Sequence, residues 1–271
     1  MPSATAQSTW DARIARAREL ASIRPPARDL LTFYAALAEY QRTLAASARD
    51  AGTFGVDQVV DAIPGLLAWL RENGPASLAQ SVEQLDRRGL DSLVASAFRR
   101  PSTELGTPLS LSKGRKDASG AANPAEQFVI ESLLQAFAEH LENGDASAPG
   151  SLPLRCPRCA GLPVAAVLRE EGHGAKRSLL CAICLHEWEC LRIVCPACGE
   201  QEFDRLPVYS AEQFAHVRID ACDRCHHYIK TIDLTKDGLA VPCVDDIASV
   251  SLDLWARERG YVRIQHNLLG I

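Results

Sequence analysis

The sequence between residues 156 and 225 contains four Cys-x-x-Cys pairs, which read Cys156-Pro-Arg-Cys159, Cys181-Ala-Ile-Cys184, Cys195-Pro-Ala-Cys198 and Cys222-Asp-Arg-Cys225. Eight of the ten cysteines of the chain lie in these pairs. The first two pairs are separated by 21 residues, the last two by 23 residues, and the two couples by 10 residues. This spacing is typical of two consecutive four-cysteine metal sites, each built from two turns that a hairpin brings together.

Two residues between the cysteines of a pair allow both thiolates to face the same metal ion. A cross-braced arrangement, in which the two sites exchange pairs, is disfavoured because each long gap contains its own predicted hairpin. Gly199 directly follows a pair and can adopt the positive φ that such a turn often needs. Sequential pairing therefore predicts one site formed by Cys156, Cys159, Cys181 and Cys184, and a second site formed by Cys195, Cys198, Cys222 and Cys225.

The spacing of the cysteines does not identify the metal, because a tetrahedron of four thiolates suits both zinc and a single iron ion. Two zinc ions would make both sites structural and closed to substrate. Two iron ions would allow each site to change its charge by one on reduction. A redox dithiol is a third interpretation of a Cys-Pro-x-Cys pair, but that motif is expected alone, where a strand meets a helix.

Several residues near the pairs have less specific roles. His186, His226 and His227 lie close to pair cysteines, and we expect them to be exposed or to contact the ligands, since four cysteines complete each site. Cys190 and Cys243 fall outside the pairs and are interpreted as small buried residues. The sequence contains no clear Ser/His/Asp pattern and no Gly-rich phosphate loop, so no catalytic or cofactor-binding residue is predicted.

Composition and charge narrow the class of partner. The chain has 271 residues, of which 47% are hydrophobic and 23% charged, and its net charge is -5. Residues 151–230 contain ten Lys or Arg and ten Asp or Glu. A module that binds nucleic acid is expected to carry a clear positive excess. The balanced charge therefore favours a protein partner and argues against nucleic acid.

The sequence also bears on localisation. No apolar run approaches the roughly 20 residues that span a bilayer, and the N-terminus has no apolar region of about 7 to 15 residues that would mark a secretory signal. We therefore expect a cytoplasmic protein without membrane insertion. In a reducing compartment, regularly spaced cysteines are better interpreted as metal ligands than as disulfides.

The first half of the chain has a helical pattern. Apolar residues recur at steps of three and four, and the predicted helices together form a bundle over residues 10–143. Pro64 is expected to kink or restart one helix and Gly89 to divide another. Asn123 is expected to cap a helix that ends at Gly144. Residues 101–123 are predicted to be a loop, and residues 145–153 a linker.

The second half is predicted to contain short strands at 163–168, 178–180, 188–194, 215–219 and 228–234, followed by a helix at 246–257. In that helix, Ile247, Val250, Leu254 and Trp255 are expected to face inward. The predicted fold is thus multidomain α and β: an N-terminal helical bundle, two rubredoxin-like or zinc-ribbon-like β modules and a short C-terminal helix. The predicted domains are 1–150 (helical), 151–191 (first four-cysteine module) and 192–271 (second module with the C-terminal helix).

The residues around the pairs carry a more specific resemblance. The series Cys156-Pro-Arg-Cys159-Ala-Gly-Leu-Pro, Leu180-Cys-Ala-Ile-Cys-Leu-His-Glu-Trp188, Cys195-Pro-Ala-Cys-Gly199 and Cys222-Asp-Arg-Cys-His-His-Tyr-Ile-Lys-Thr-Ile-Asp233 resembles the formate dehydrogenase accessory protein FdhE family. The match is specific over residues 153–265 and looser over the helical half. The resemblance implies two rubredoxin-like modules that hold iron, and binding to the catalytic subunit of respiratory formate dehydrogenases, which mature in the cytoplasm.

The resulting hypothesis is a non-catalytic, cytoplasmic protein that helps to assemble formate dehydrogenase by binding its catalytic subunit through a metal-containing module. Two metal ions in four-cysteine sites are expected, with iron favoured and zinc as the alternative. The competing hypothesis is a rubredoxin-like electron-transfer protein, or a protein that handles thiols or sulfur, acting on a redox enzyme. The oligomeric state is left open by the sequence.

Overall fold

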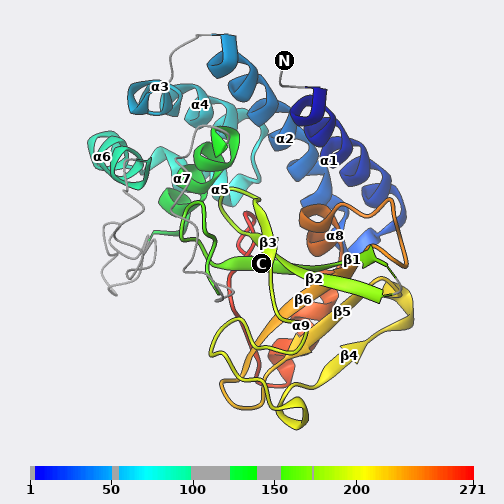
Figure 1. The fold of residues 1–271 in the computed structure, drawn as a ribbon. Helices are drawn as coiled ribbons and strands as arrows, with labels where there is room; N and C mark the ends of the chain where they lie inside the picture. Colours follow the sequence, from blue (N-terminus) through cyan, green and yellow to red (C-terminus); the bar gives the residue numbers. More distant parts are fainter. Residues whose placement is uncertain (1–3, 51–54, 99–122, 139–153, 173) are drawn as a thin grey trace.

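The computed structural model describes residues 4–50, 55–98, 123–138, 154–172 and 174–271. Helices occupy its first half, and a single mixed β-sheet together with two further α-helices occupies its second half (Figure 1). Residues 101–122 of the loop predicted at 101–123, and the linker predicted at 145–153, lie outside the described residues. The predicted fold class is confirmed, whereas the division into three domains stays a prediction. Within the described residues, no helix is both long and apolar enough to cross a lipid bilayer.

The helical half begins with two long helices that lie side by side, with a short 3-10 turn at Pro25–Ala27 between them (Figure 1). The α-helices of this half are α1 (Ala4–Ile23), α2 (Arg28–Asp50), α3 (Val56–Asp61), α4 (Ile63–Asn73), α5 (Ala76–Glu83), α6 (Arg87–Phe98) and α7 (Pro124–Ala136).

Helix boundaries follow local signals in some places and not in others. The helix predicted around Pro64 is divided as expected, because this proline stands in the first turn of α4. The oxygen of the Asn123 side chain accepts hydrogen bonds from the backbone N–H groups of Ala125 and Glu126, so the predicted cap is present. The helix predicted to break at Gly89 instead ends at Glu83, and Gly89 lies inside α6. Helix α7 ends at Ala136, earlier than Gly144, which lies outside the described residues.

The sheet has the strand order β3-β2-β1-β6-β5-β4, and β7 pairs with β6. Strands β1 to β3 come from the first cysteine couple, and strands β4 to β6 from the second. Parallel pairing of β1 with β6 joins the two sets into one sheet. The strands are β1 (Pro163–Glu171), β2 (Gly174–Cys181), β3 (Glu187–Glu189), β4 (Val208–Ser210), β5 (Val217–Ala221), β6 (His227–Asp233) and β7 (Val262–Arg263).

The predicted strand at 188–194 is much shorter in the structure, where β3 ends at Glu189. The buried Arg177 side chain explains the difference. Its Nη1 donates to the carbonyl oxygens of Leu191 at 3.3 Å and Val194 at 3.0 Å, so no neighbouring strand is needed to satisfy these groups. Strands β4 and β7 have only three and two residues, too few to produce a recognisable pattern.

The predicted C-terminal helix consists of two helices, α8 (Pro242–Ala248) and α9 (Val250–Glu258). The break has a cause in tertiary structure: the Nζ of Lys230 donates at 2.5 Å to the Asp246 carbonyl, which an unbroken helix would bond to the N–H of Val250. The turn at the break also changes the inward face. Ile247 is buried as expected, but Leu254 is 55% exposed, so its predicted inward position is wrong.

The helices and the sheet share a hydrophobic core. Buried residues of α2 and α7, such as Leu31 and Leu133, belong to the same cluster as Leu179 of β2 and Ile229 of β6. Cys156, Cys181 and Cys184 are also part of this cluster. The first group of pair cysteines is therefore built into the contact region between the helical half and the sheet.

Candidate metal centres

The structure groups the eight pair cysteines into two sets of four, with the sequential pairing predicted from the spacing. In each set, one sulfur atom from every cysteine lies within 4.8 Å of the other three. We refer to Cys156, Cys159, Cys181 and Cys184 as the inner cluster, and to Cys195, Cys198, Cys222 and Cys225 as the outer cluster. The cross-braced alternative is not observed for these eight residues.

The distances between sulfur atoms fit a tetrahedral ion. In the inner cluster, the Sγ of Cys159 lies 3.4 Å from that of Cys181 and 3.5 Å from that of Cys184. In the outer cluster, the Sγ atoms of Cys198 and Cys222 are 3.8 Å apart. A metal–sulfur bond of about 2.3 Å places the sulfurs of a tetrahedron about 3.8 Å apart. All ten cysteines are free thiols, so each cluster offers four unlinked ligands and can hold one ion.

All four turns that carry the pairs have the same backbone geometry. The N–H of the first cysteine donates to the carbonyl five residues later, for example from Cys156 to Gly161 at 2.9 Å and from Cys195 to Glu200 at 2.8 Å. The residue after the second cysteine always has a positive φ; these residues are Ala160, Leu185, Gly199 and His226.

Only one of these four residues is glycine, so the sequence reveals the left-handed position only at Gly199. A left-handed conformation costs an ordinary residue about 1–2 kcal/mol. The other three turns therefore adopt this conformation at a cost that the hydrogen bonds and the packing around the cysteines must offset.

Gly161 allows the backbone to approach the inner cluster. A Cβ atom at this position would lie 2.9 Å from the Sγ of Cys181 and 3.3 Å from the Sγ of Cys159. It would also lie 3.2 Å from the Cδ1 of Ile183. The inner cluster thus requires a residue without a side chain at position 161. In the sequence, this requirement is visible only as a glycine two residues after a pair.

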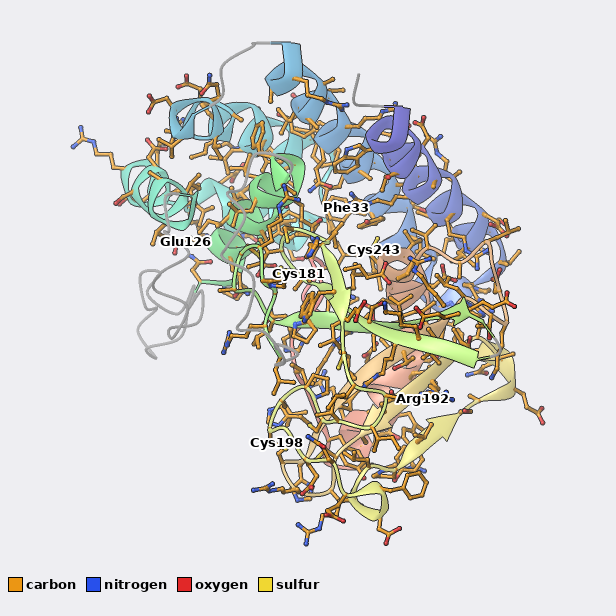
Figure 2. All side chains as sticks on the ribbon, viewed as in Figure 1. Phe33, Glu126, Cys181, Arg192, Cys198 and Cys243 are labelled. Atoms are coloured by element: carbon orange, nitrogen blue, oxygen red, sulfur yellow. The ribbon has the colours of Figure 1, made fainter. Side chains whose placement is uncertain are left out.

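The two clusters differ in exposure. Cys156 and Cys181 are fully buried, and the inner cluster borders the helical half. In the outer cluster Cys198 is exposed and Cys225 is half-buried. Figure 2 shows Cys181 close to the helices and Cys198 at the opposite end of the molecule. An ion in the inner cluster would be shielded from solvent, whereas an ion in the outer cluster would be accessible.

Backbone groups also influence the outer cluster. Desolvation opposes ionisation of Cys198, but a hydrogen bond from the backbone of Glu200, together with contacts to neighbouring sulfurs, lowers the pKa of this thiol. Outside the clusters, burial raises the pKa of Cys190. Metals bind thiolates rather than thiols, so an easily ionised Cys198 is suited to be a ligand.

The histidines near the pairs are not grouped with the sulfurs in either cluster. His227 contributes its Nδ1 to a hydrogen bond of 2.8 Å with the carbonyl of Cys225, and so contacts the outer cluster through the backbone. Cys190 is buried as predicted. Cys243 is only partly buried and lies 3.5 Å from the hydroxyl of Tyr34, at the contact between α2 and α8.

A third group of possible ligands, His216, Asp237 and Asp245, contains a protein cation. The Nη2 of Arg16 lies 2.7 Å from the carboxylates of Asp237 and Asp245. The side chain of Arg16 is only 7% exposed and comes from α1. These carboxylates therefore bind a guanidinium that links the helical half to α8, and we do not treat the group as a metal site.

A buried ion cluster lies beneath the strand that follows the last pair. Lys230 and Asp246 are both fully buried, and the Nζ of Lys230 lies 2.6 Å from the Oδ2 of Asp253. Arg263 donates at 3.0 Å to the Oδ1 of Asp253 and also bonds Asp246. Although burial opposes ionisation, the nearby Arg263 and Lys230 lower the pKa of Asp246. This cluster connects β6, β7, α8 and α9.

The buried ion cluster was not predicted from the sequence. One signal was present: Lys230 lies between the apolar residues of the strand predicted at 228–234, and a lysine that is buried requires an anionic partner. Its partners, Asp246 and Asp253, lie on segments whose position relative to the strand depends on the tertiary structure.

Comparisons with known proteins agree with this arrangement. Residues 193–269 match the family model described as FdhE, C-terminal domain. The Protein FdhE homolog of Aquifex aeolicus is 43% identical over 116 residues, which are 42% of this chain and 41% of that protein. The Protein FdhE homolog of Haemophilus ducreyi is 27% identical over 282 residues, covering 96% of this chain and 88% of that protein.

A crystal structure of the FdhE protein from Pseudomonas aeruginosa has a similar fold, with a TM-score of 0.68 and 23% sequence identity. The superposition covers 99% of this chain and 96% of that one. The relatives with higher sequence identity match this chain over a shorter region. That region spans only 41% of the Aquifex protein and 35% of the Protein FdhE homolog of Haemophilus influenzae.

Proposed function

Because this chain belongs to the FdhE family, we propose that it is a non-catalytic accessory protein for the assembly of a respiratory formate dehydrogenase. It acts in the cytoplasm, where it binds the catalytic subunit of that enzyme through the half of the chain that carries the two cysteine clusters. The observation that carries this proposal is the pair of four-cysteine clusters within an FdhE-like fold.

The eight clustered cysteines are the proposed metal ligands, and iron is the favoured metal, with zinc as the alternative. Each bound ion would cross-link two turns and could, if it is iron, also accept one electron. The chain itself contributes the thiolates, the turn geometry and the shielding of the inner cluster. The inner ion would stabilise the contact between the helices and the sheet, and the outer ion would order the exposed end of the sheet.

The proposal is tested by co-purification of the tagged full-length protein with the catalytic subunit of formate dehydrogenase. We expect the wild-type protein to retain the subunit, and Cys195→Ser combined with Cys198→Ser to weaken retention. Cys243→Ser, which changes a cysteine outside both clusters, is the matched control. Wild-type protein that fails to retain the subunit, or binding that tolerates serine at all eight ligands, would contradict the proposal.

The metal is tested separately by elemental analysis of freshly isolated protein together with its visible spectrum. Iron held by thiolates gives a coloured protein, whereas zinc gives a colourless one. Two ions per chain are expected, falling to about one in the variant that lacks Cys195 and Cys198. Full metal content in that variant would contradict the assignment of these residues as ligands.

A second candidate function is electron transfer to a redox enzyme, and one observation favours it. Cys198 is exposed, so an iron ion in the outer cluster would lie close to the surface where a redox partner could approach. This function requires a reversible one-electron reduction of the purified protein. A protein that contains only zinc, or that shows no reversible potential, would exclude it.

A further inference from the structure

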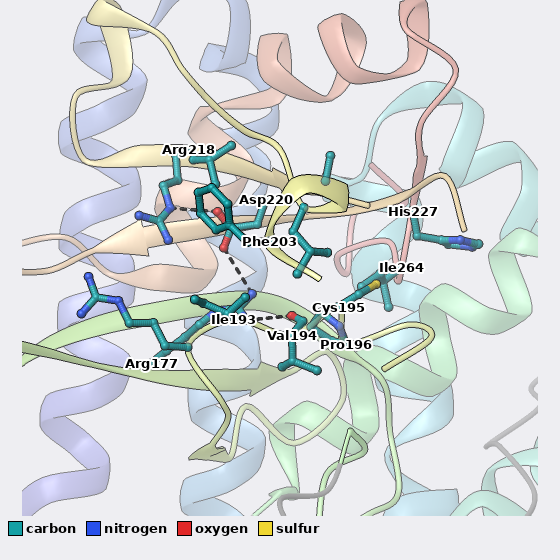
Figure 3. Close-up of a pocket in the computed structure, with 14 residues that line it drawn as sticks. Arg177, Ile193, Val194, Cys195, Pro196, Phe203, Arg218, Asp220, His227 and Ile264 are labelled. Atoms are coloured by element: carbon teal, nitrogen blue, oxygen red, sulfur yellow. Dashed lines mark hydrogen bonds and ion pairs between the residues drawn. The ribbon is translucent and has the colours of Figure 1, made fainter. Parts of the chain in front are cut away.

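A cavity of about 220 Å³ lies beside the outer cluster. Its walls are the segment 192–196, the segment between Phe203 and Val208, and the face of β5 that carries Asp220 (Figure 3). Cys195 is a wall residue, so the cavity adjoins the outer cluster directly. We call this cavity the outer groove.

The rim of the outer groove is unusually apolar. Phe203 is 72% exposed, Val208 is 52% exposed and Ile193 is 48% exposed. Exposed large apolar residues that gather around one cavity are typical of a binding site. A cavity of about 150 Å³ can hold a benzene molecule, so the outer groove has room for one large apolar side chain.

The charge of the groove favours an anion. Arg177 and Arg218 both bond Asp220, at 3.2 Å and 2.8 Å, and together they outweigh its single negative charge (Figure 3). Arg192 is an exposed third arginine of the lining. Among the described residues, no hydrogen bond or ion pair of its guanidinium is present. Arg192 is therefore free to bind a carboxylate of a ligand.

The position of β4 favours an extended peptide over a compact small molecule. β4 is the last strand in the order of the sheet, so its outer edge has no strand partner within the described part of the chain. Val208, its first residue, lines the outer groove. An exposed edge can pair with an extended segment of another protein, while an adjacent cavity accepts one of its side chains.

We propose that the outer groove binds an extended segment of the catalytic subunit in which a large apolar side chain lies close to a carboxylate. The apolar side chain enters the cavity between Phe203 and Ile193, and the carboxylate pairs with Arg192. This inference rests on the proposed function and assigns the surface through which the subunit is bound.

The outer cluster would then act on binding through the shape of the groove. Cys195 and Pro196 belong to a turn that carries two cysteines of the outer cluster, and both residues also line the outer groove. A metal ion in the outer cluster fixes this turn, so removal of that ion is expected to loosen one wall. The inner cluster has no residue in the lining, and its loss affects the groove only through global stability.

The test measures the affinity of the full-length protein for the purified catalytic subunit. The groove variants are Ile193→Asp and Arg192→Glu, and the matched controls are Leu239→Asp and Leu254→Asp. Leu239 is 80% exposed and Leu254 is 55% exposed, and neither lines the groove. Three of the changes place a negative charge at an exposed apolar position and Arg192→Glu reverses a charge at an exposed position, so all four alter only the surface and their effects on folding should be small. We expect at least a tenfold loss of affinity for the groove variants and less than a twofold change for the controls.

The outcomes separate the two proposals. A wild-type protein that does not bind the subunit refutes the proposed function. If the wild-type protein and all four variants bind equally well, the groove proposal is wrong while the proposed function stands. A groove variant that changes the oligomeric state of the protein but not its affinity for the subunit would also overturn the proposal, since the groove would then contact a second copy of this chain.

The chemistry of the occupant is tested with overlapping peptides that cover the catalytic subunit. Peptides that carry an aromatic or long aliphatic residue close to Asp or Glu should bind best, and Arg192→Glu should abolish their preference for the acidic residue. Arg192→Lys should retain part of that preference, because it keeps the positive charge. Preferential binding of basic peptides by the wild-type protein would overturn the assignment.

Discussion

Gly161→Ala tests whether the backbone must approach the inner cluster without a side chain. The new Cβ would lie 2.9 Å from the Sγ of Cys181, whereas ordinary contacts begin at 3.4 Å. The sulfur or the turn must therefore move by about 0.5 Å. Metal–ligand distances tolerate deviations of about 0.2 Å, so this displacement is large enough to weaken metal binding. Overpacking of this kind costs about 1–3 kcal/mol in stability.

The matched control is Gly174→Ala in the same hairpin, where the nearest atom to a new Cβ is the carbonyl oxygen of Glu171 at 4.0 Å. Metal content and the free energy of unfolding in urea are measured for both variants. We expect Gly161→Ala to bind about one ion per chain and to lose about 1–3 kcal/mol, while the control keeps two ions. If Gly161→Ala retains two ions and unfolds at the same urea concentration as the control, the reasoning from the close contact is wrong.

Three further predictions follow from other parts of the structure. Replacing Lys230 by Met leaves Asp246 and Asp253 with one cation fewer, and the free energy of unfolding in urea should fall by about 3–5 kcal/mol. The control Lys236→Met, at an exposed position, should lower it by less than about 1 kcal/mol. Similar losses for both variants would contradict the importance of the buried ion cluster. Burial raises the pKa of Glu131 from 4.5 to about 7, so its carboxyl binds a proton more tightly in the folded state, and stability should fall as the pH rises from 4.5 through 7. Glu131→Gln should remove the penalty of ionising this buried carboxyl, which is on the order of 3 kcal/mol at pH 8, and should have a much smaller effect at pH 5. Thermal unfolding at the two pH values measures both effects. An equal gain in stability at both pH values would refute the raised pKa of Glu131. A chelator should remove the metal in two phases, the faster one from the outer cluster because Cys198 is exposed, and a faster loss from the inner cluster would contradict the inferred difference in access.

The difference between the two clusters gives the molecule a division of roles. The inner cluster belongs to the core shared by the helices and the sheet, and three of its four cysteines are buried, while Cys159 is partly buried. The outer cluster lies next to the groove and exposes Cys198. A stable inner ion would hold the two halves together, while the outer ion would connect metal binding to the shape of the groove.

Local sequence was sufficient for several features of the fold. The spacing of the four pairs predicted two sequential clusters, because each pair and its turn form within a few residues and each long gap contains strand pairing of its own. Asn123 and Pro64 likewise act on the helix turns next to them. These features follow from short-range hydrogen bonding and steric restriction, which a single sequence can show.

The grouping of the cysteines and the change from helices to strands follow from the sequence alone. The parallel pairing of β1 with β6, which joins the two cysteine couples in one sheet, depends on long-range contacts that no segment of the sequence specifies. Two other features also depend on long-range packing. The hydrogen bonds of Arg177 shorten the strand after Trp188, and the hydrogen bond of Lys230 breaks the helix between α8 and α9. In each case a buried polar group had to find a partner distant in the sequence, and no local pattern specifies which partner that will be.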